Sequence, residues 1–111
     1  MSQPARISQT VTGEVRIIHT TGLHARPSVM FTRLAKTFNA MIYVADNAHG
    51  PWINAKSIVK VMGLKAPFGT TLFIRSEGCD AELAVKHLSR LIEDDFEENE
   101  TLNGIENVNG P

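Results

Sequence analysis

The sequence predicts a two-layer α+β sandwich, in which three helices cover one face of an open four-stranded antiparallel sheet. Hydrophobic spacing alternates between a period of two and a period of about 3.6 residues, in the order β-α-β-β-α-β-α. A short turn, rather than a helix, separates the second and third strands, which favours an antiparallel pair. Three helices are too few to cover both faces of the sheet, so we expect them on a single face.

Four segments have the residue types and alternation of strands. They are residues 11–18, 41–45, 51–53 and 70–75. In the first of these, Val15 and Ile17 point one way while Glu14 and Arg16 point the other, which is typical of a half-buried strand. The third segment begins with a proline, which cannot donate to a ladder, so we place it at an edge of the sheet.

Three segments have apolar residues at helical spacing, and each begins with a residue suited to a helix start. Pro27 is tolerated in a first turn, while Ser57 and Asp80 are good N-cap residues. The apolar stripe of the third helix is predicted to contain Leu83, Ala84, His87, Leu88, Leu91 and Ile92. We therefore interpret His87 as a residue of the core or its boundary.

The chain has 111 residues, which suits one domain. We expect the folded domain to span residues 10–96, with a flexible extension at 1–9 and a flexible acidic and polar tail at 97–111, because both ends have few apolar residues.

Composition excludes several classes of protein. The 11 basic and 12 acidic residues give a net charge of −1, which argues against a nucleic-acid binder and against a polybasic membrane-surface protein. No apolar run reaches the roughly 18–20 residues of a membrane-spanning helix, and residues 1–9 do not resemble a secretion signal. A single cysteine cannot form an intramolecular disulfide. These features predict a cytoplasmic protein.

The segment Gly22-Leu23-His24-Ala25-Arg26-Pro27 carries the strongest chemical signal, because it lies between a strand and a helix. His24 is predicted at the N-cap, where unpaired backbone N–H groups and the helix dipole favour an anion. Arg26 adds a fixed cation that can bind oxyanions. An imidazole with a free ring nitrogen at this position is a nucleophile beside backbone N–H groups that can bind a phosphate. The alternative is that His24 simply ends a strand and Arg26 is solvated.

Two motifs together resemble those of the histidine-containing phosphocarrier protein HPr family of the bacterial phosphotransferase system, including its nitrogen-type relatives. They are residues 22–27 (GLHARP) and 54–58 (NAKSI). The resemblance implies an HPr-like fold and a monomer. It implies that enzyme I phosphorylates His24 on Nδ1, with phosphoenolpyruvate as original donor, and that an enzyme IIA-type protein receives the group. Arg26 would hold phosphoryl oxygens, and an HPr kinase/phosphorylase would modify Ser57.

Further residues are candidates for binding rather than chemistry. The hydroxyl of Thr21 could bond to the imidazole or to a phosphoryl oxygen, or could cap a turn. Ala25 lies between the two principal residues, and Ile58, Val59 and Met62 are candidates for an apolar docking patch, although some of this set belongs to the core. Ser57 has the alternative role of an ordinary N-cap.

A metal site or cofactor is not expected. The four histidines, His19, His24, His49 and His87, are irregularly spaced, and Cys79 stands alone.

Three functions follow from these residues. The first is a phosphocarrier, a shuttled substrate rather than a stand-alone turnover enzyme. The second is a regulatory binding module whose phosphorylation at His24 or Ser57 controls a kinase or a transcription regulator. The third, a hydrolase with His24 as general base, ranks last because no nucleophile motif or carboxylate orienter accompanies that histidine.

Overall fold

The computed structural model describes residues 9–96. Seven elements follow one another in the predicted order β-α-β-β-α-β-α. They are β1 (Gln9–Arg16), α1 (Ala25–Ala35), β2 (Met41–Ala45), β3 (Ile53–Asn54), α2 (Ile58–Gly63), β4 (Thr71–Gly78) and α3 (Ala81–Glu93).

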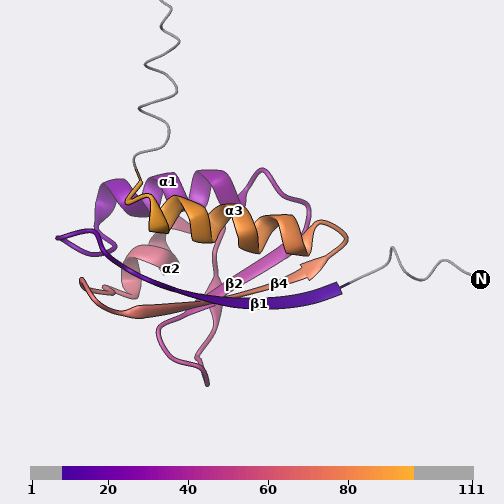
Figure 1. The fold of residues 1–111 in the computed structure, drawn as a ribbon, viewed down its shortest axis with the longest axis horizontal. Helices are drawn as coiled ribbons and strands as arrows, with labels where there is room; N and C mark the ends of the chain where they lie inside the picture. The colour runs from indigo at the N-terminus through magenta and orange to yellow at the C-terminus, as the bar shows by residue number, and fades with distance from the viewer. Residues whose placement is uncertain (1–8, 97–111) are drawn as a thin grey trace, which may run out of the picture.

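The four strands form one antiparallel sheet in the order β1-β4-β2-β3. The long strands β1 and β4 pair along their full length, from Arg16 opposite Thr71 to Gln9 opposite Gly78. All three helices lie on one side of the sheet, with α1 and α3 running above β1 and β4 (Figure 1). The predicted two-layer α+β sandwich is therefore confirmed.

The core lies between the sheet and the helices. In β4 the inward positions Leu72, Ile74 and Ser76 alternate with half-buried outward ones, as the period of two in a strand requires. Each helix contributes fully buried side chains on the other side of the core. These are Phe31 of α1, Val61 of α2, and Leu88 and Ile92 of α3. This packing fixes α1 against the sheet, and so fixes the loop that leads into α1.

Element boundaries differ from the sequence prediction at several points. Strand β1 begins at Gln9 and ends at Arg16, and β4 extends to Gly78. Strand β3 begins only at Ile53 and is an edge strand, as expected. Pairing with neighbouring strands sets these limits. The strand propensities of the residues in one segment carry no information about that pairing.

The predicted apolar stripe of α3 was wrong at two positions. Leu83 is 51% exposed and His87 is exposed, whereas the buried face consists of Ala81, Ala84, Val85, Leu88, Leu91 and Ile92. At about 100° per residue, Leu83 falls nearly opposite Leu88 and His87 falls on the flank. His87 is a boundary residue, since its ring lies edge-on to Phe38 with 5.8 Å between centroids.

The predicted N-cap Asp80 occupies that position, but its side chain makes no cap bond. Its two carboxylate oxygens instead accept hydrogen bonds from the backbone N–H groups of Asn39 and Ala40, each at 2.8 Å. Asp80 thus joins the start of α3 to the chain entering β2. Beside it, the chain's single cysteine, Cys79, is exposed between β4 and α3.

Candidate functional site

His24 is the N-cap residue of α1 and its side chain is exposed. Its backbone is extended, with φ −89° and ψ −161°, and its carbonyl accepts the first helical hydrogen bond, from the Ser28 N–H at 3.1 Å. The imidazole makes no capping bond to the helix. The predicted position at the helix start is confirmed, and the ring is accessible to a reaction partner at the positive end of the helix dipole.

The loop before His24 is held by close backbone contacts. Gly22 has φ +73°, and its N–H donates to the His19 carbonyl at 2.9 Å. The Leu23 N–H donates to the Ala66 carbonyl at 2.8 Å, which ties this loop to the segment after α2. A Cβ on Gly22 would collide with the Ala66 carbonyl oxygen and lie 2.8 Å from the Pro67 Cα. Only glycine fits this approach.

The first turn of α1 is supported from inside. Leu23 is buried in the core immediately before His24. Ser28 is fully buried, and its hydroxyl donates to the Leu23 carbonyl at 3.4 Å. The exposed imidazole therefore projects from a backbone that is anchored on both sides, which limits the motion of the ring.

A hollow of about 410 Å³ opens beside the imidazole. Its lining comes from the β1–α1 loop, from α2 and from the loop after α2: Thr21, Leu23, His24, Met62, Lys65, Ala66 and Pro67. None of these residues is acidic. Arg26, exposed in the first turn of α1, adds another cation close in sequence. The chemistry of this region suits an oxyanion.

The structure brings some predicted binding residues to His24 and leaves others apart. Thr21 and Met62 line the hollow with His24, and no hydrogen bond from the Thr21 hydroxyl is present among residues 9–96. On α2, Val59 is 75% exposed and Met62 is 39% exposed, while Ile58 is half-buried. Part of the predicted patch thus faces solvent.

Ser57 occupies the N-cap of α2, as predicted. Its hydroxyl oxygen accepts a hydrogen bond from the Lys60 N–H at 3.2 Å. Its side chain is half-buried. This is the geometry of an ordinary N-cap.

Lys65 and Pro67 line the hollow beside His24, although nothing in the sequence marks them as its neighbours. Their proximity to His24 depends on the bond between Leu23 and Ala66, which joins segments 43 positions apart (66 minus 23). No local pattern signals such a contact.

A second missed feature is a tether between the His24 loop and the end of α3. The Nδ1 atom of His19 lies 2.8 Å from the Asp95 Oδ1, and the two share a hydrogen bond. The His19 ring also packs edge-on against Phe96, with centroids 5.8 Å apart. Asp95 and Phe96 both have positive φ, at 56° and 61°, so the chain reverses sharply to make these contacts.

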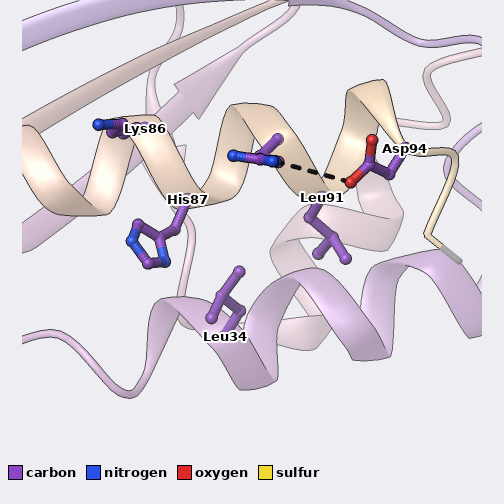
Figure 2. A pocket seen from close by; sticks show the side chains of 6 residues that line it. Leu34, Lys86, His87, Leu91 and Asp94 are labelled. Atoms are coloured by element: carbon purple, nitrogen blue, oxygen red, sulfur yellow. Dashed lines mark ion pairs between the residues drawn. The ribbon is translucent and has the colours of Figure 1, made fainter. Parts of the chain in front are cut away.

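Another hollow, of about 360 Å³, lies between α1 and α3 and shares no lining residue with the first. Figure 2 shows His87 and Leu91 of α3 facing Leu34 of α1, beside the ion pair of Arg90 and Asp94 at 3.8 Å.

Within residues 9–96, no three His, Cys, Asp or Glu side chains gather as metal ligands would, and no helix is long and apolar enough to cross a bilayer.

Comparison with known proteins decides the family. The protein-family model described as "PTS HPr component phosphorylation site" matches residues 11–94 of the chain. The chain belongs to the HPr family of the phosphotransferase system. This match confirms the resemblance to the HPr family that the two sequence motifs indicated.

Individual HPr relatives cover most of the chain. It is 40% identical over 79 residues to the phosphocarrier protein HPr of Haemophilus influenzae, which covers 71% of this chain and 91% of the relative. It is also 40% identical over 80 residues to that of Vibrio cholerae, covering 72% and 92%. The crystal structure of an HPr from Bacillus anthracis superimposes with a TM-score of 0.70 at 35% identity, covering 75% of this chain and 96% of that one.

Proposed function

We propose that this protein is a phosphocarrier that accepts a phosphoryl group on His24 from enzyme I and passes it to an enzyme IIA-type protein. Phosphoenolpyruvate is the original donor. The observation that carries the proposal is the exposed imidazole of His24 at the start of α1 in a chain of the HPr family.

The transfer needs one free lone pair on the ring. The Nδ1 lone pair of neutral His24 attacks phosphorus in line, and a nitrogen–phosphorus bond forms as the bond between phosphorus and enzyme I breaks. The electron pair of the broken bond stays with the donor, and the reverse exchange delivers the group to the acceptor. Phosphoryl transfer depends mainly on positioning and charge stabilisation, so a small domain can serve.

Negative charge on the phosphoryl oxygens is stabilised by features around His24. Backbone N–H groups in the first turn of α1 and the helix dipole favour an anion at this position. The guanidinium of Arg26 offers charge-assisted hydrogen bonds to the same oxygens. Replacing Arg26 by alanine should therefore slow transfer without unfolding the domain, since Arg26 is exposed.

Docking of both partners is proposed over α1 and α2 near His24. Ala25 and Val59 are exposed there, Met62 borders the hollow, and Ile58 supports them as a half-buried residue. Thr21 lines the same hollow and offers a hydroxyl to the imidazole or to a phosphoryl oxygen. An exposed apolar patch beside a reactive group is typical of a protein docking site.

The test is phosphorylation in vitro. Incubation with phosphoenolpyruvate and enzyme I should give an acid-labile, base-stable phosphoryl adduct, and a subsequent IIA-type acceptor should remove it. The His24→Ala variant should give no adduct, while His87→Ala should behave as the wild type because His87 lines the separate hollow. Absence of an adduct with a competent enzyme I would refute the carrier function.

A regulatory function for the same protein is favoured by the place of Ser57 at the start of α2. Phosphorylation of Ser57 by an HPr kinase/phosphorylase would add negative charge beside the proposed docking face and weaken the binding of enzyme I. Ser57→Asp should lower the affinity for enzyme I and leave the circular dichroism spectrum unchanged. Equal affinity of Ser57→Asp and Ser57→Ala would exclude this regulation.

The proposed carrier works in the cytoplasm as a monomer and needs neither cofactor, nucleic acid nor membrane. Light scattering at micromolar concentration tests the oligomeric state, with a mass close to 12.2 kDa as the expected result.

A further inference from the structure

Lys65 has an unusual backbone conformation for its residue type. It follows α2 with φ +50°, in the left-handed region, and its N–H donates to the Met62 carbonyl at 3.0 Å. Glycine is the usual residue where a helix ends in this conformation, because a Cβ is disfavoured there. A lysine in this unfavourable conformation suggests that its side chain has a functional role.

The surroundings of Lys65 indicate what that use is. Lys65 lines the hollow beside His24 together with Thr21, and the residues lining it include no carboxylate. Its side chain is exposed, and within residues 9–96 its ammonium has no hydrogen-bond or ion-pair partner. A lysine on a flexible four-carbon stem can therefore turn its charge toward an anion in this hollow.

We infer that Lys65 is a phosphoryl-binding residue, whose ammonium bonds to an oxygen of the phosphoryl group carried on His24. The inference rests on the proposed phosphocarrier function and extends its site to a loop that the sequence does not connect with His24. The ammonium forms no covalent bond; it donates a charge-assisted hydrogen bond and favours the dianionic form of the group. Lys65 thus acts from the α2 side of the hollow, and Arg26 from α1.

The ionisation of the phosphoryl group tests this directly. The protein is phosphorylated chemically with phosphoramidate, whose phosphorus–nitrogen bond breaks with loss of ammonia as the bond to the imidazole forms. The ³¹P resonance assigned to His24, by its absence in His24→Ala, is then titrated with pH. This route uses no partner protein, so failure of phosphorylation by enzyme I and failure of the Lys65 proposal give different results.

Lys65→Gln should raise the pKa of the phosphoryl group by roughly half a unit to one unit, because loss of a nearby cation disfavours the dianion. Lys65→Arg should restore the wild-type value. Lys86→Gln is the matched control, since it makes the same change in net charge at the separate hollow between α1 and α3. It should leave the titration unchanged.

An identical titration for wild type and Lys65→Gln would overturn the inference. If Lys65→Gln in that case also bound enzyme I more weakly, Lys65 would be a docking residue instead. Lys65→Gly separates strain from charge: it should raise the melting temperature by removing the Cβ, yet shift the phosphoryl titration as far as Lys65→Gln does.

Discussion

Replacing Gly22 by alanine tests whether close backbone packing holds the loop that carries His24. Two costs add at this position. Forcing an alanine to φ +73° costs about 1–2 kcal/mol. The new Cβ also collides with the Ala66 carbonyl, which must move and weaken its 2.8 Å bond from the Leu23 N–H, for about 1 kcal/mol more. The sum is a loss of about 2–3 kcal/mol in the free energy of unfolding.

The chain provides a matched control in Gly69. This glycine also has positive φ, at +92°, but a Cβ there meets no atom within 4 Å. Gly69→Ala should therefore show the conformational cost alone, about 1–2 kcal/mol. Urea denaturation of both variants measures the difference. In the same samples the rate of His24 phosphorylation should fall for Gly22→Ala more than for Gly69→Ala, because only the first displaces the His24 loop.

Equal destabilisation by the two substitutions would refute the reasoning, since it would mean that the contact between Gly22 and the loop after α2 is not rigid. Loss of stability with a normal phosphorylation rate in the folded fraction would show that the contact supports the fold but does not position His24.

Three other interactions give separate predictions. Asp80→Ala should lower the free energy of unfolding by about 2–3 kcal/mol, because two backbone N–H groups before β2 lose a charged acceptor, and Asp80→Asn should recover part of the loss in urea titrations. Ser57→Ala should cost about 1 kcal/mol of stability through loss of the α2 cap, with His24 phosphorylation at the wild-type rate; a slower rate would show a further role for the hydroxyl. Asp95→Asn keeps an acceptor for His19 and tolerates positive φ, so its stability in thermal melts should be close to that of the wild type. Asp95→Ala should lower the stability by about 1–2 kcal/mol. Equal stabilities of the two variants would mean that the contact between His19 and Asp95 contributes nothing.

The order of elements followed from local patterns. Val15 and Ile17 are buried while Glu14 and Arg16 are exposed, as their alternation predicted. Periodicity works here because a strand packed on one face must place every second side chain in the core. His24 at the start of α1 was predictable for a similar reason, since strand spacing ends and helix spacing begins on either side of it.

Features made by contacts between distant segments were not predictable. Asp80 has the sequence signature of an N-cap, and nothing local indicates that its carboxylate instead binds the chain before β2. The same holds for the His19–Asp95 tether. Leu83 shows the limit of periodicity itself, since one extra apolar residue in α3 shifted the predicted stripe away from the buried face. Tertiary packing decides such cases.

The pairing of β1 with β4 separates two ends of the molecule. The Thr71 end of β4 adjoins the His24 loop, because the Ile17 N–H donates to the Thr70 carbonyl at 2.8 Å and the Gly69 N–H to the Ile17 carbonyl at 2.8 Å. Cys79 follows the other end of β4, eight residues beyond Thr71 and so on the order of 25 Å away. A fluorophore coupled to that exposed thiol would report on binding of a partner protein while leaving the His24 imidazole unobstructed.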